Sequence, residues 1–166
     1  MEYSGKWSET WNSIVDSYRQ ESDRAAAILA AAFADEFLKE CIQSFLIDDA
    51  SIKKLFEGYS SLSSFSARID VAYALGLMTQ SVQRDLNLVR KVRNHFAHHP
   101  SDTSFDISPV RDYCSNLSTA QESVRDDITF KKATPRKQYL SAIGLAIVET
   151  HNIRVKKNKL TIPYAE

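Results

Sequence analysis

Apolar residues recur at intervals of three and four along most of the chain, the spacing that keeps one face of an α-helix apolar. The longest such run extends from Ser22 to Ile47. Its first half is rich in alanine, and small side chains allow a second helix to approach closely. The pattern therefore predicts a long central helix over residues 22–47.

Further helices are predicted before and after this one. They cover residues 5–18, 51–57, 65–77, 80–98, 109–117 and 135–155. The last two begin at Ser108-Pro109 and Thr134-Pro135, where a capping hydroxyl precedes a proline at the first helical position. Residues 118–132 are charged and weakly patterned, which favours a loop or a short helical turn.

The helix pattern and the length together predict the architecture. A chain of 166 residues, 43% of them hydrophobic, is the usual size of one domain with one core. We expect an all-α single-domain bundle of about six to seven helices around the long central helix. The core is expected to span about residues 21–117, with the helices over 5–18 and 135–155 packed on it.

Charge and cysteine usage narrow the possible functions. The chain has 21 basic and 21 acidic side chains, so no summed positive field attracts a phosphate backbone unless basic residues gather on one face. Cys41 and Cys114 lie in apolar helical runs without metal-site or secreted spacing, which favours buried thiols. No apolar stretch is long enough for a membrane span, so we expect a soluble, cytoplasmic protein.

Several charged residues occupy places where the helical pattern expects core. A charge turned into a helical core costs several kcal/mol unless it meets an opposite charge or several hydrogen bonds. We therefore predict that these residues meet, either as one ion-pair network that sets the register of the helices or as a groove for a partner or ligand. The predicted cluster consists of Glu21, Asp23, Arg24, Arg68, Asp70 and Arg93.

The end of the helix over 80–98 holds a second candidate site. Arg93, Asn94 and His98 resemble the Rx4-6H motif of the HEPN superfamily, whose active members are helical, usually dimeric RNA endonucleases. Histidine can move a proton near neutral pH and arginine can stabilise phosphorane charge. Helical periodicity separates Arg93 and His98 by about 140°, so a long side chain or a second subunit would have to bridge them. A histidine in a last turn also favours the helix dipole without any further role.

His95 and His99 are the weak candidates for a metal site. Their spacing of four can place two imidazoles on one ion, but only loop residues such as Asp102 and Asp106 are near as further ligands. The sequence contains no glycine-rich phosphate loop and no nucleophile elbow. We therefore expect neither a metal nor a cofactor.

Three motifs in order resemble the mannitol operon repressor family. They are residues 21–26, residues 62–77 and residues 93–98, followed by Cys114 and Leu117. The resemblance covers about residues 21–117 and implies an all-helical bacterial regulator of transcription that lacks a recognisable DNA-binding motif. We expect a non-enzymatic homodimer that acts through a protein partner, without direct sequence-specific DNA binding. The alternative is a metal-independent RNA endonuclease that uses Arg93 and His98, and RNA is expected as a ligand only in that case.

Overall fold

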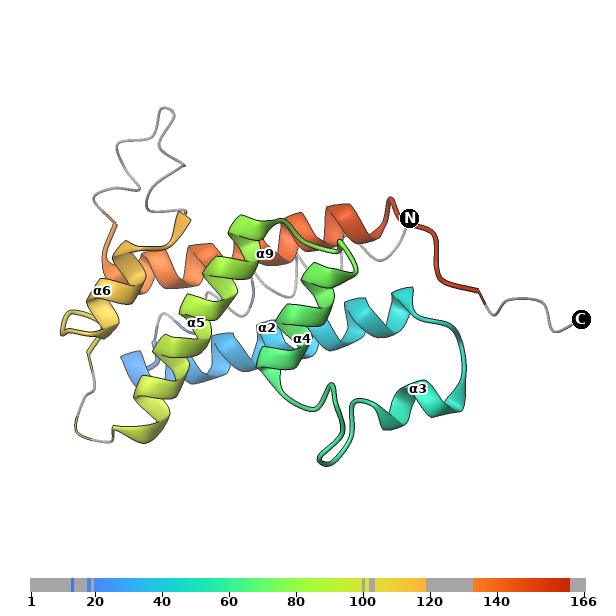
Figure 1. The fold of residues 1–166 in the computed structure, drawn as a ribbon. Helices are drawn as coiled ribbons and strands as arrows, with labels where there is room; N and C mark the ends of the chain where they lie inside the picture. Colours follow the sequence, from blue (N-terminus) through green and yellow to red (C-terminus); the bar gives the residue numbers. More distant parts are fainter. Residues whose placement is uncertain are drawn as a thin grey trace, which may run out of the picture.

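The computed structural model describes residues 13, 18, 20–99, 101, 104–118 and 133–161. Most of the helix predicted over 5–18, and the segment 118–132 apart from Ser118, lie outside these residues. The described part has no strand, which confirms the all-α class. Its helices are α2 (Asp23–Phe45), α3 (Ala50–Lys54), α4 (Phe65–Ala74), α5 (Gln80–His98), α6 (Val110–Ser115) and α9 (Pro135–Arg154), shown in Figure 1.

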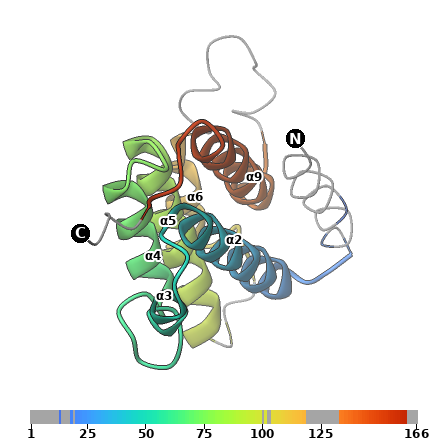
Figure 2. The same cartoon turned by 90° about the vertical axis from the view of Figure 1, so that its right-hand side faces the viewer.

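Helix α2 runs through the bundle as predicted. The Ser22 hydroxyl accepts a hydrogen bond from the Ala25 amide at 3.2 Å and caps its first turn. Five alanines of its first half are buried, and α2 packs against α4, α5 and α9 (Figure 2). Short side chains explain how three helices approach the same one so closely. Helix α5 is as central as α2, because it contacts α2, α4, α6 and α9.

Helix α4 and helix α5 form a hairpin around Gly76. The glycine has a φ of 64°, a left-handed conformation that costs a residue with a Cβ atom free energy. Its amide donates to the Tyr73 carbonyl at 2.8 Å, and the Leu77 amide donates to the Ala72 carbonyl at 2.8 Å. These bonds end α4 at Ala74, three residues before the predicted end. Helix α5 has the predicted bounds.

The predicted start of α9 is confirmed, and that of α6 is wrong in one respect. Thr134 caps α9 by accepting from the Lys137 amide at 3.3 Å, and Pro135 is the first helical residue. At α6, by contrast, Pro109 occupies the cap position and no side chain caps the helix. The Ser108 hydroxyl instead donates to the Asp112 carboxylate at 2.7 Å, because this charged acceptor lies within its reach.

Aromatic side chains fill the core between α2, α5 and α9. The ring of Phe105 lies 5.1 Å from that of Phe96 and 5.3 Å from that of Tyr139, measured between centroids. The Tyr139 hydroxyl is fully buried and donates to the Ala27 carbonyl at 2.8 Å. Both cysteines are buried as predicted. None of the described helices combines the length and the apolar character needed to cross a membrane.

Candidate functional site

Arg68 is the buried centre of the charged residues on α2, α4 and α5. Its Nη1 atom donates to Oδ1 of Asp35 at 2.7 Å, and only 8% of its side chain is exposed. Its Nε atom donates to the Leu62 carbonyl at 2.9 Å, and Nη2 donates to the Ser63 carbonyl at 3.4 Å. Arg68 therefore joins α2, α4 and the turn before α4. Asp35 was not among the predicted site residues, because it lies 33 positions from Arg68 in the sequence.

The Asp35 carboxylate lies under the influence of two arginines. Burial raises its pKa, while the charges of Arg68 and, more weakly, Arg93 act in the opposite direction. The Asp35 side chain is 29% exposed, so solvent still reaches part of it. The effect of burial is larger than that of the arginines, so Asp35 in the folded protein holds a proton more readily than an aspartate in water does.

The start of α2 forms a second and separate charged group. Asp23 accepts a hydrogen bond from Nη1 of Arg136 at 2.8 Å and from the Phe105 amide at 3.0 Å. Arg136 also donates to the carbonyls of Tyr18 and Glu21. Asp23 thus joins α2 to α9 and to the segment before α6. Arg136 was not among the predicted site residues, because it lies more than one hundred positions away in the sequence.

Arg24 and Asp70 differ from the prediction in their partners. Nη2 of Arg24 lies 3.5 Å from the Ala97 carbonyl near the end of α5. Asp70 is exposed and accepts from Nε2 of Gln83 at 3.4 Å. Residues two apart on a helix point in different directions, so Asp70 cannot follow Arg68 into the bundle. Glu21 is exposed and contributes its backbone carbonyl.

Among the described residues, the ion pairs of the predicted cluster do not join into a single network. Its acidic and basic members separate into a group around Arg68 and a group around Asp23, and each group contains a partner that was not predicted. Both groups connect helices: Arg68 joins α4 to α2, and Arg136 joins α9 to α2. The two ion pairs lie where α2 packs against α4 and α9.

Arg93, Asn94 and His98 lie on the last two turns of α5. Arg93 is exposed, and its Nη1 atom donates to Oδ1 of Asn94 at 3.0 Å. His98 is exposed in the last turn of the helix. The structure thus brings Asn94 to Arg93, and it leaves both Arg93 and His98 accessible to a ligand.

His95 and His99 pack on each other. Their rings stack with centroids 4.2 Å apart and planes inclined by 14°, and Nδ1 of His99 lies 3.0 Å from the His95 carbonyl. Nowhere in the described part do three side chains of His, Cys, Asp or Glu gather in a way that could hold a metal ion. The histidine pair therefore offers flat ring surfaces at the end of α5.

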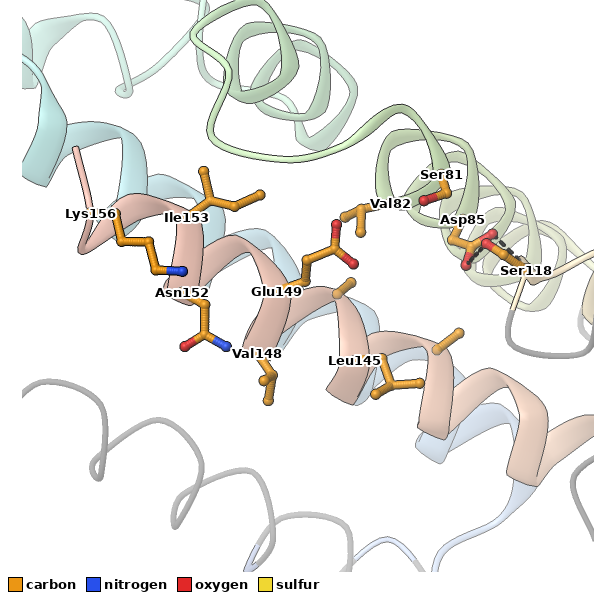
Figure 3. Close-up of a pocket in the computed structure, with 12 residues that line it drawn as sticks. Ser81, Val82, Asp85, Ser118, Leu145, Val148, Glu149, Asn152, Ile153 and Lys156 are labelled. Carbon is orange, nitrogen blue, oxygen red and sulfur yellow. Dashed lines mark hydrogen bonds between the residues drawn. The ribbon is translucent and has the colours of Figure 1, made fainter. Parts of the chain in front are cut away.

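A groove of about 560 Å³ lies between the first turns of α5 and the second half of α9 (Figure 3). Asp85 and Ser118 are at one end, where the buried Asp85 carboxylate accepts from the Ser118 amide at 2.9 Å and from its hydroxyl at 2.6 Å. Asn152 and Lys156 are at the other end. The sequence did not predict this groove, because its residues come from three distant segments without a motif.

Comparison with protein families matches residues 23–160 to the family described as mannitol repressor. The chain belongs to the mannitol repressor family. The matched range includes every helix described above and extends beyond the resemblance at residues 21–117, so α9 is part of the family region. No curated protein matches the chain.

Proposed function

We propose that the chain is a transcriptional regulator of the mannitol repressor type that reaches its promoter through a protein partner. The family match over residues 23–160 carries the regulatory part of this proposal. It covers the whole described bundle and not a single motif. The family's description supplies mannitol genes as the first target to test.

The surroundings of α5 support the partner-dependent part. Two helices joined by a short turn at Gly76 have the connectivity of a helix-turn-helix, whose second helix contacts bases through its first residues. Here those first residues lie near carboxylates. Glu149 accepts a hydrogen bond from the hydroxyl of Thr79 at 2.5 Å, and Asp70 accepts one from Gln83. Phosphate groups approaching this end of α5 meet negative charge, which opposes direct DNA reading.

A reporter experiment tests the regulatory part. A mannitol operon promoter is fused to a reporter in a bacterial strain that lacks its own copy of the regulator. Expression of this chain is expected to lower reporter output, while a reporter with an unrelated promoter stays unchanged. Equal output with and without the chain would refute the regulatory proposal.

A gel-shift experiment tests the partner-dependent part separately. The purified chain alone is expected to leave the promoter fragment unshifted at physiological salt. If the purified chain alone shifts the fragment, and promoter DNA but not unrelated DNA competes, the chain binds DNA directly and with sequence specificity. That result would overturn the proposed need for a protein partner. The homodimer expected from the sequence stays a prediction, and sedimentation of the purified chain measures it.

A further inference from the structure

The neutral net charge of the chain conceals an uneven distribution on α5. This helix carries Arg84, Arg90, Lys91 and Arg93, and its single carboxylate is Asp85. Asp85 is buried and bonded to Ser118, so it does not offset the cations on the exposed side. The local positive surface that composition could not exclude is therefore present on this helix.

The cations are concentrated in the second half of α5. Arg90, Lys91 and Arg93 lie within four consecutive positions, and the last turn adds His98, followed by His99. Lys91, Arg93 and both of these histidines are exposed. We call residues 90–99 the α5 cationic segment.

The arginines of this segment keep donors available. Arg93 donates to the neutral side chain of Asn94, and Nη2 of Arg90 lies 3.4 Å from Oδ1 of Asn87. Nε of Arg90 is buried, so a ligand could reach only the outer nitrogens of that side chain. Neither arginine forms an ion pair with any described residue. A guanidinium with unused N–H groups is suited to bind phosphate oxygens.

Carboxylates on the neighbouring helices are already bound to other groups. Asp35 on α2 pairs with Arg68, and Asp112 on α6 accepts from the Ser108 hydroxyl. The exposed Asp70 lies beside Gln83 in the first half of α5, away from the segment. Three of the four lysines and arginines of α5 lie in this segment, so an anion meets more positive charge there than in the first half of the helix.

Flat side chains are interleaved with these cations. The imidazole rings of His95 and His99 are stacked, and His98 and His99 are exposed. Imidazole rings and guanidinium planes stack on unpaired bases, which a duplex hides inside its own base stack. Cations next to flat groups therefore fit single-stranded RNA better than duplex DNA.

We propose that the α5 cationic segment binds single-stranded RNA, with Arg90, Lys91 and Arg93 on the phosphates and His98 and His99 against the bases. This function is additional to promoter regulation, because it uses the opposite end of α5 from the one that contacts Glu149 and Asp70. Failure of the RNA experiment leaves the reporter result untouched, so the two proposals can be distinguished.

Fluorescence anisotropy of a labelled, unstructured RNA oligonucleotide with the full chain tests this proposal. The double variant Arg90→Gln and Arg93→Gln is expected to raise the Kd at least tenfold. It should also reduce the slope of log Kd against log salt concentration by about 0.7 for each phosphate that the variant no longer neutralises. Arg84→Gln removes the same charge from the first half of the same helix, and we expect it to change the Kd less than twofold.

The histidines provide the second readout. Replacing His98 and His99 with alanine is expected to raise the Kd for RNA several-fold and to leave the salt dependence unchanged, because stacking releases no counterions. Circular dichroism confirms that each variant is folded. If the wild type cleaves RNA and these variants do not, that result would also show that RNA binds at the segment.

Three results would overturn the proposal. They are no RNA binding by the wild type, equally weakened binding in Arg84→Gln and the double variant, and binding of duplex DNA as tight as that of RNA.

Discussion

The contact between Arg68 and Asp35 allows the sharpest prediction about stability. Arg68→Ala removes the partner of Asp35 and also the donors to the carbonyls of Leu62 and Ser63. Breaking a mostly buried pair by removing one member costs about 3 to 5 kcal/mol. For a chain of this length, that destabilisation lowers the Tm by about 10 °C.

Substitutions of Asp35 should destabilise the protein less than Arg68→Ala does, and Asp35→Asn less than Asp35→Ala. Asp35→Ala leaves Arg68 with two carbonyl acceptors but without an opposite charge, so we expect a destabilisation of about 3 kcal/mol. Asp35→Asn keeps an oxygen that can accept from Arg68, and we expect about 1 kcal/mol. Asp70→Ala is the matched control, because Asp70 is exposed and its removal should change stability by less than about 0.5 kcal/mol.

Urea denaturation followed by circular dichroism measures these free energies. A double-mutant cycle with Arg68→Ala and Asp35→Ala should give a coupling of at least about 1 kcal/mol, because the two side chains touch. Additive effects of the two substitutions, or a destabilisation by Asp70→Ala as large as that by Asp35→Ala, would refute the assigned pairing.

The pH dependence of the same pair has a definite sign. Burial raises the pKa of Asp35 above its ordinary value, so the folded state binds the proton more tightly than the unfolded state. The resulting contribution to stability is full below the ordinary aspartate pKa of about 3.9 and is lost as pH rises through the raised pKa. The stability of the wild type relative to Asp35→Asn should therefore fall across that interval, and a rise would contradict the assigned cause.

Three further predictions concern the turn, the groove and the thiols. Gly76→Ala should destabilise the chain by about 1 to 2 kcal/mol in urea denaturation, because the residue has a φ of 64°; an unchanged midpoint would contradict the strain. Asp85→Ala should cost about 2 to 3 kcal/mol by the same method, since it leaves the amide and hydroxyl of Ser118 without their acceptor; a neutral effect would refute the role of this pair. Burial raises the pKa of Cys41 and of Cys114 to about 12, so a thiol reagent at pH 8 should modify them only after unfolding, and rapid labelling of the native chain would disprove this.

Local sequence determined most of the helices and several of their ends. The apolar spacing predicted α2, α5 and α9, and the caps at Ser22 and Thr134 lie where a hydroxyl precedes the helical pattern. These features depend on residues within one or two turns of each other, so they can be read from the chain directly. Burial of Arg68 was also predicted, because the helical pattern expects a core residue at position 68.

Tertiary structure alone decided which charges meet. Arg68 pairs with Asp35 across 33 positions, and Arg136 reaches Asp23 across 113. The groove between α5 and α9 and the accessible end of α5 likewise exist only once the helices are packed. Helical periodicity states which face of a helix is apolar, but the angle and register at which two helices cross depend on the side chains of both. Those two quantities choose the partner of each buried charge and the face that remains open to a ligand.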